Sequence, residues 1–120
     1  MKYLVTLALL VLSCSANAAV CYVSEYESMV IDDSGRIVHV PQEPAITVQA
    51  INHTTTTQSA AFNADTRFVG IVCDEASYFE FGPNPTSTTA DPYIPANVRW
   101  FFGIARGAAL EVSFCDADCS

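Results

Sequence analysis

The sequence predicts an all-β fold, a single small antiparallel β-sandwich or barrel that follows a cleaved signal peptide. Three observations support this prediction. The chain has 120 residues and 51% of them are hydrophobic, which suits one domain with one core. Short β-branched and aromatic runs recur, separated by Gly, Pro, Asn and Asp. No segment keeps a helical period long enough to complete three turns.

The N-terminus has the three parts of a Sec signal peptide. Lys2 supplies the positive charge, an apolar run follows to Leu12, and Ala16-Asn17-Ala18 is an A-x-A cleavage motif. We expect cleavage between Ala18 and Ala19, so that residues 1–18 are the signal and residues 19–120 the mature domain. The apolar run is shorter than the roughly 20 residues that a bilayer span requires. One alternative is lipidation of Cys14, which Leu12 fits poorly.

Cleavage at this point changes both the charge and the cysteine count. The mature chain keeps four Arg and no Lys against 13 acidic residues, a net charge of −9. Such a chain is unsuited to nucleic acid or to anionic lipid, because both require clustered basic residues. Losing Cys14 leaves an even number of cysteines, which in an exported domain indicates two disulfides. The sequence leaves the three pairings of these four open: Cys21, Cys73, Cys115 and Cys119.

The first expected supersecondary element is a hairpin. Val20–Ile31 alternates loosely, Asp32-Asp33-Ser34-Gly35 forms the turn, and Arg36–Val40 returns. Pro41 and Pro44 then end the pairing. Gly82–Pro92 carries three prolines and is expected to be a long loop. Further strands are expected at Ala45–Ile51, Ser59–Phe62, Thr66–Cys73, Tyr78–Phe81, Val98–Ile104 and Ala109–Cys115.

Two features of these strands bear on the core. Cys73 follows Val69 and Ile71 at alternate positions, so all three side chains are expected to point inward. In Trp100-Phe101-Phe102 the first and third side chains share one face and Phe101 takes the other. An exposed aromatic binding patch is the alternative interpretation of that triplet.

Five short motifs follow one another between residues 58 and 114: Ser59–Asn63, Thr66–Val69, Phe81–Thr86, Ile94–Asn97 and Phe101–Ile104 before Arg106-Gly107. In this order they resemble small virion-associated structural proteins of tailed bacteriophages. The resemblance implies a compact β domain with a structural role on a particle and no known chemistry. The signal peptide and cysteines depart from cytoplasmic virion assembly, so we interpret the chain as an exported relative of that domain.

The sequence predicts neither catalytic, cofactor-binding nor metal-binding residues. His39 is expected on a half-exposed strand and His53 in a loop beside a Thr tract, and two histidines alone do not specify zinc. Neither H-E-x-x-H, C-x-x-C nor G-x-S-x-G occurs. In Cys115-Asp116-Ala117-Asp118-Cys119, carboxylates disfavour thiolates, so a C-terminal staple is expected instead of a redox or metal site.

The expected function is therefore that of an exported, non-enzymatic structural or binding protein, periplasmic, extracellular or virion-associated. Its partner is expected to be a protein of a virion, a filament or the cell envelope. Two alternatives remain. One is an envelope-acting interaction factor, for example one that blocks a phage receptor, and the other is a small secreted hydrolase. Disulfide connectivity, oligomeric state and the role of residues 19–57 are not determined by the sequence.

Overall fold

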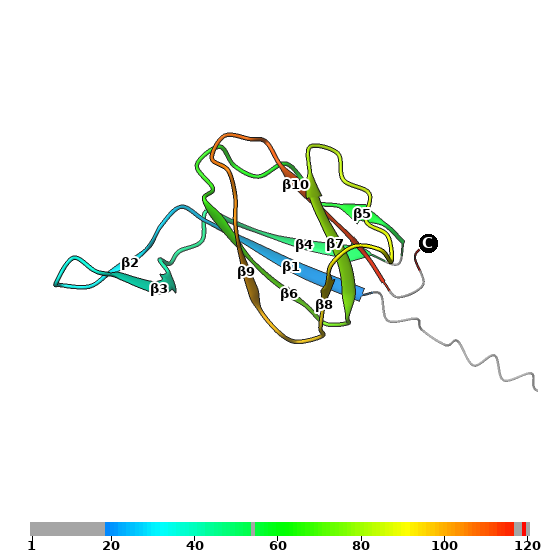
Figure 1. Cartoon of the computed structure of the whole chain (residues 1–120), viewed down its shortest axis with the longest axis horizontal. Helices are drawn as coiled ribbons and strands as arrows, with labels where there is room; N and C mark the ends of the chain where they lie inside the picture. The colour runs from blue at the N-terminus through cyan, green and yellow to red at the C-terminus, as the bar shows by residue number, and fades with distance from the viewer. Residues whose placement is uncertain (1–18, 54, 117–118, 120) are drawn as a thin grey trace, which may run out of the picture.

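The computed structural model describes residues 19–53, 55–116 and 119, and these residues form an antiparallel β-sandwich with no helix (Figure 1). The first sheet has the strand order β4-β1-β6-β9 and the second has the order β5-β10-β7-β8. Strands β2 and β3 form a separate two-stranded hairpin. The first five strands are β1 (Ala19–Tyr26), β2 (Met29–Ile31), β3 (Ile37–Pro41), β4 (Thr47–His53) and β5 (Thr57–Gln58). The others are β6 (Phe68–Cys73), β7 (Ser77–Gly82), β8 (Tyr93–Ile94), β9 (Trp100–Gly103) and β10 (Glu111–Cys115).

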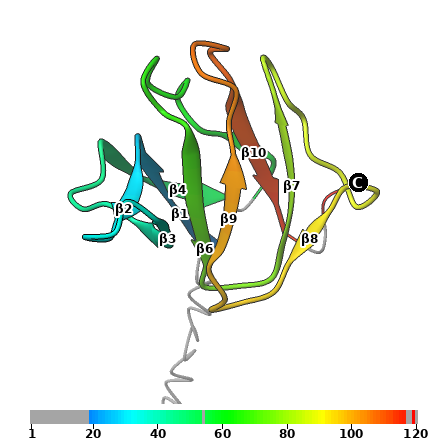
Figure 2. The same cartoon turned by 60° about the vertical axis from the view of Figure 1, so that its left-hand side comes forward.

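Both sheets contribute alternate residues to one core between them. The first sheet turns the odd-numbered side chains of β1, β4 and β6 inward. The second sheet turns the side chains of Phe79, Val112 and Phe114 inward to meet them. Figure 2 shows the strands of the two layers along the sandwich. The fully buried members from the first sheet are Cys21, Val23, Val69, Ile71 and Cys73.

Two disulfides are present, Cys21–Cys73 and Cys115–Cys119. Cys21 and Cys73 are directly opposite on the antiparallel strands β1 and β6. The prediction that all four cysteines pair within one chain is confirmed, as is the inward orientation of Cys73 beside Val69 and Ile71. The second bridge staples the C-terminal end, as expected.

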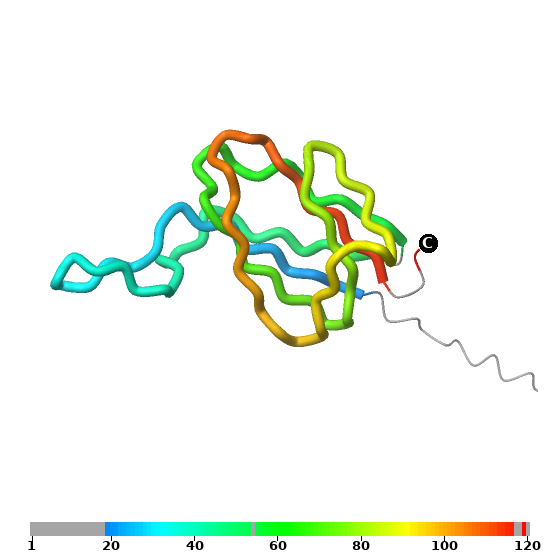
Figure 3. The backbone as a smooth tube through the Cα atoms, in the orientation of Figure 1, coloured from blue at the N-terminus to red at the C-terminus, as the bar shows by residue number. Residues whose placement is uncertain are grey.

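The β2–β3 hairpin projects away from the sandwich. In the tube view it extends from the end of β1 and returns to the start of β4, on the far side from β5 (Figure 3). Hydrogen bonds to the Asp32 side chain hold its turn. The Asp32 carboxylate accepts hydrogen bonds from the backbone N–H groups of Ser34 and Arg36, at 2.9 Å each, and from the Ser34 hydroxyl. Gly35 takes a φ of 80°, which glycine adopts without strain.

A long loop, residues 83–92, folds back over the second sheet. The Ser113 hydroxyl points outward from β10 and accepts the backbone N–H of Ser87 at 2.7 Å, and the two hydroxyls are 2.7 Å apart. The Gln58 side-chain amide donates to the Pro85 carbonyl at 2.6 Å. Ser87 and Ser113 are buried. The loop therefore covers the part of the second sheet's outer face around Ser113.

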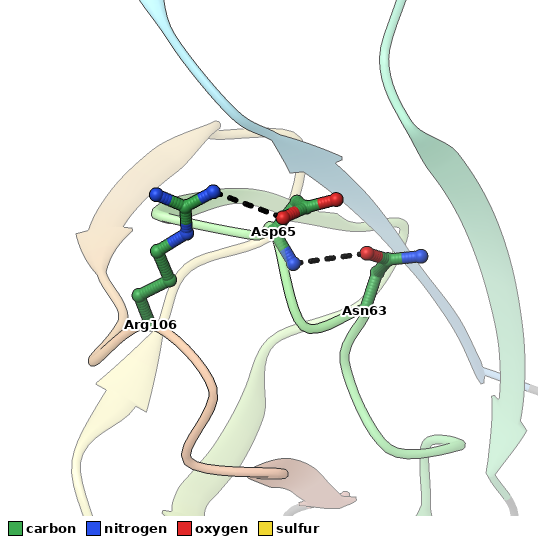
Figure 4. Close-up of polar contacts among 3 residues, drawn as sticks. All are labelled: Asn63, Asp65 and Arg106. Carbon is green, nitrogen blue, oxygen red and sulfur yellow. Dashed lines mark hydrogen bonds and ion pairs between the residues drawn. The ribbon is translucent and has the colours of Figure 1, made fainter.

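At the end of the sandwich from which the hairpin leaves, two loops are joined by polar contacts. Arg106 forms an ion pair with Asp65 at 3.0 Å, and the Asp65 backbone N–H donates to the Asn63 side chain at 2.9 Å (Figure 4). Both charged side chains are at least half exposed, Arg106 at 50% and Asp65 at 58%. An exposed pair of this kind contributes about 0–1 kcal/mol.

The structure corrects parts of the strand prediction. The expected strand Val20–Ile31 is two strands, because β1 pairs with β4 and β6 and only β2 belongs to the hairpin. Ser59–Phe62 is not a strand, since its backbone N–H groups at Ser59 and Phe62 bond to the start of β10 from a loop. Strands β5 and β8 were not predicted. The signal peptide and its cleavage between Ala18 and Ala19 involve residues outside those described.

Candidate functional site: the open face of the first sheet

The outer face of the first sheet carries no charged side chain within its strands. Strand registers align the outward residues in rows across β4, β1, β6 and β9. Solvent-facing strand positions of an antiparallel sheet are usually polar, whereas here nearly all are apolar. The outward residues are Val20, Tyr22, Ser24, Tyr26, Val48, Ala50, Asn52, Phe68, Gly70, Val72, Phe101 and Gly103.

Aromatic rings cover one part of this face. Tyr26 and Phe68 stack at 5.3 Å between ring centroids, and the Phe101 ring lies 6.5 Å from each. Phe101 reaches this position because Gly70 has no side chain: a Cβ there would lie 2.7 Å from the Phe101 ring. The expected split of the triplet is thus confirmed, with Phe102 packed on the core and Phe101 on the outside.

The remainder of the face is open to solvent. Tyr22 is 45% exposed, Val48 59% and Phe101 47%. Tyr22 is flanked in its row by Ala50 and Val72, so the exposed rings and aliphatic groups are neighbours. Monomeric soluble proteins rarely expose a large contiguous apolar patch, and such a patch bounded by polar residues marks an interaction site.

The hairpin extends this apolar surface. A cavity of about 300 Å³ lies between its base and the sheet, lined by Met29, Ile31 and Ile37 from the hairpin and by Phe68 from the outer face. Ile31 and Ile37 are each 64% exposed. A two-stranded hairpin without a core of its own is marginally stable in water. Most of the Ile31 and Ile37 side-chain surface therefore stays in contact with solvent.

The tip of the hairpin is held electrostatically. Hydrogen bonds from Ser34 and from the Arg36 backbone lower the pKa of Asp32 below its ordinary value of 3.8. Asp32 and Asp33 both lie in this exposed turn, as the sequence predicted. His39 lies on β3 and is exposed.

A second cluster of reactive side chains lies inside the core. His53 Nε2 is 3.1 Å from Cys21 Sγ and 3.3 Å from the Ser77 hydroxyl, and its ring stacks on Phe114. The prediction of a loop position for His53 is wrong. It is the last residue of β4, where the inward alternation of Gln49 and Ile51 carries it into the core.

Ser77 and His53 are a hydroxyl–imidazole pair that the sequence did not reveal. They are 24 residues apart and meet because the end of β4 and the start of β7 lie on the same side of the core. Both are sealed from solvent, and His53 Nδ1 has no hydrogen-bond partner among the described residues. A Ser–His catalytic pair needs an accessible hydroxyl and a third group on Nδ1, so this pair is unsuited to acyl transfer. Burial also lowers the pKa of His53, against the raising effect of Asp116, Asp74 and Glu75.

Glu25 is a buried carboxylate that sequence patterning also missed. It lies inward on β1 and is 1% exposed. Its Oε1 accepts the Asn63 backbone N–H and the Thr66 hydroxyl, each at 2.7 Å, and Gln49 donates to Oε2 at 3.3 Å. A charged acceptor strengthens such bonds. Glu25 thus positions the loop that leads into β6.

Comparison with known proteins gives no match to a family model, a curated protein or a solved structure. The phage resemblance of residues 58–114 therefore stays a prediction that rests on its short motifs. In the fold these motifs occupy parts of β6, β7, β8 and β9 and the adjoining loops. None of the described residues belongs to a helix long and apolar enough to cross a membrane.

Proposed function

We propose that this protein is an exported, non-enzymatic binding module that docks on a protein partner through its first sheet. The docking face consists of the outward residues of β4, β1, β6 and β9 together with the β2–β3 hairpin. The observation that carries the proposal is the lack of any charged residue among the outward strand positions of a sheet whose chain has 13 acidic residues.

The two sheets show why this face is unusual. On the second sheet, the loop of residues 83–92 covers the outer face around Ser113, where it places Ser87. On the first sheet, the Tyr26 hydroxyl donates to Glu43, which follows β3, and Tyr26 is buried, whereas Tyr22, Val48 and Phe101 stay exposed. A partner that covers Tyr22, Val48 and Phe101 would remove from water the area that the chain leaves open.

Charge indicates the chemistry of the partner. The two cavities beside the base of the hairpin are lined by Glu27 and Glu43, and Arg67 is the one cationic residue among their linings. A partner with an apolar centre and Lys or Arg at its rim complements this arrangement. A second copy of the mature chain, with its net charge of −9, would place like charges at the rim.

Export is supported by the disulfides, since bridged cysteines are consistent with an oxidising periplasmic or extracellular environment. The predicted signal peptide agrees with this location. In such a location the partner is a structural protein of a virion or filament, or a protein of the cell envelope. The phage resemblance favours the virion, and receptor blocking at the envelope is the alternative role.

The test compares two exposed tyrosines. Tyr22→Glu places a charge in the docking face, whereas Tyr93→Glu places one on the second sheet at a similar exposure, 48% against 45%. We expect the wild-type protein and Tyr93→Glu to co-sediment with particles or envelopes of the producing cells, and Tyr22→Glu to remain in the supernatant. Thermal melts check that both variants fold.

Either of two results would overturn the proposal. One is co-sedimentation of Tyr22→Glu at the wild-type level. The other is wild-type protein that stays free of every particle and envelope fraction. A partner identified in the pellet as a virion protein or as an outer-membrane protein decides between the two locations.

A further inference from the structure

We propose that the reduced form of this protein binds one zinc ion in its core, through Cys21, Cys73 and His53. The inference concerns the interior and is independent of the docking face. The candidate ligand atoms of these three residues all lie within 4.8 Å of one another. Two thiolates and one imidazole are a donor set that Zn²⁺ prefers.

The fold holds the three ligands in place before any ion arrives. They come from the neighbouring strands β4, β1 and β6, and all three side chains point inward at the same end of the sheet. The strand register sets Cys21 directly opposite Cys73. Zn–S and Zn–N bonds of about 2.0–2.3 Å require ligand atoms within about 4 Å of one another. The 3.1 Å between His53 Nε2 and Cys21 Sγ already meets this requirement.

The surroundings also suit a cation. Ser77 Oγ lies 3.3 Å from His53 Nε2 and 3.8 Å from Cys21 Sγ, so its hydroxyl or a water molecule can take the fourth position. His53 Nδ1 has no partner among the described residues, although the side chain is fully buried. Coordination would use Nε2, the ring nitrogen that faces Cys21 Sγ and the Ser77 hydroxyl.

Disulfide and zinc are alternative states of the same cysteines. A dithiol reductant supplies two electrons and two protons, breaks the Cys21–Cys73 bond and is itself oxidised to a disulfide. Zinc then displaces both thiol protons as the two Zn–S bonds form. The oxidised protein offers no thiolate. The zinc-bound state therefore belongs to the chain before oxidation, wherever cellular dithiols keep its cysteines reduced.

The experiment isolates the core pair. In a chain carrying Cys115→Ser and Cys119→Ser, the C-terminal pair can no longer bind metal. This variant is titrated anaerobically with Co²⁺, once oxidised and once after reduction by a phosphine. We expect the reduced form to develop the visible bands of tetrahedral, thiolate-bound Co²⁺ at one equivalent, and Zn²⁺ to displace the Co²⁺. Absence of these bands, or equal bands in the oxidised form, would overturn the proposal.

His53→Phe is the matched variant, because it keeps an aromatic ring against Phe114 and removes only the nitrogens. We expect its zinc affinity in chelator competition to fall at least about tenfold. An unchanged affinity would contradict the assignment of His53. Circular dichroism shows whether the reduced chain stays folded. If reduction unfolds the chain, zinc must restore the β signal. Zinc binding without that recovery would also refute the site.

Discussion

The outer faces of the two sheets differ in their exposure to solvent. Each sheet of a sandwich buries one face in the core, and its other face points outward. The second sheet turns Ser113 outward and seals it under residues 83–92, with the bond to Ser87. The first sheet turns Tyr22, Val48 and Phe101 outward and leaves them to solvent. The covered face is polar and the open face is apolar, which is the reverse of what a free-standing domain requires.

The two disulfides also differ between the sheets, in the length of chain that each one closes. Cys21–Cys73 joins the two central strands of the first sheet and spans 52 residues, whereas Cys115–Cys119 spans four at the end of the second. In the chain-entropy account, the stabilisation grows with the length of the closed loop. We therefore expect Cys21→Ala with Cys73→Ala to lose about 4 kcal/mol of unfolding free energy, and Cys115→Ala with Cys119→Ala about 2 kcal/mol.

Denaturant unfolding of the two double variants measures this difference. Equal losses would show that the bridge within the first sheet does not contribute the larger share. A greater loss from the C-terminal pair would reverse the ranking and would make the second sheet the more dependent on its staple.

The buried contact between the cover and the second sheet is made by the Ser113 hydroxyl. Ser113→Ala leaves the Ser87 backbone N–H without its acceptor, which costs about 1–3 kcal/mol. Hydrogen exchange should then rise in residues 83–92 and stay unchanged in β1. Ser34→Ala, in the exposed hairpin turn, is the control. If Ser113→Ala leaves the loop as protected as in the wild type, other contacts hold the cover.

On the first sheet, the corresponding test is Gly70→Ala. The added Cβ would meet the Phe101 ring at 2.7 Å, so the ring must leave the face. Because this ring is half-exposed and can swing aside, we expect a loss of no more than about 1 kcal/mol. Gly103→Ala, where no atom lies within 4 Å of the new Cβ, should be neutral. NOE contacts between Phe101 and Phe68 should vanish only in Gly70→Ala, and their persistence would contradict the packing described.

The smallest expected effect is the pH response of the hairpin tip. The folded-state pKa of Asp32 lies below the ordinary 3.8, so its contribution is complete above that value. It is lost as the pH falls through the lower folded-state pKa. Amide chemical shifts of Ser34 and Arg36 should titrate together in that window, and Asp32→Asn should abolish the transition. Titration at or above the ordinary value would show that the turn does not hold the carboxylate as described.

Features of the fold that depend on local spacing could be predicted from the sequence, whereas the choice of pairing partner could not. Period-two alternation predicted most strands and the inward direction of Val69, Ile71 and Cys73, because these depend on local spacing. It failed at Val20–Ile31, where one apolar run serves two different partners, β4 and β3. That choice is made by pairing across the fold, and no local pattern encodes it.

The candidate sites were less accessible for the same reason. His53 was expected in a loop beside threonines, yet the register of β4 with β1 brings it to Cys21. Glu25 reads as an ordinary surface acid, and only the approach of Asn63 and Thr66 makes its burial favourable. The apolar residues of the open face stand at alternate positions in the sequence, but whether a loop covers them depends on tertiary structure.

The most direct test of the open face is site-specific photo-crosslinking in the producing cell. A benzophenone amino acid is placed at Tyr22 or Val48 on the first sheet, and at Tyr93 on the second. The account predicts one discrete protein adduct from Tyr22 and from Val48, the same protein in both cases, and none from Tyr93. Adducts of equal yield from Tyr93, or an absence of adducts from Tyr22 and Val48, would contradict it.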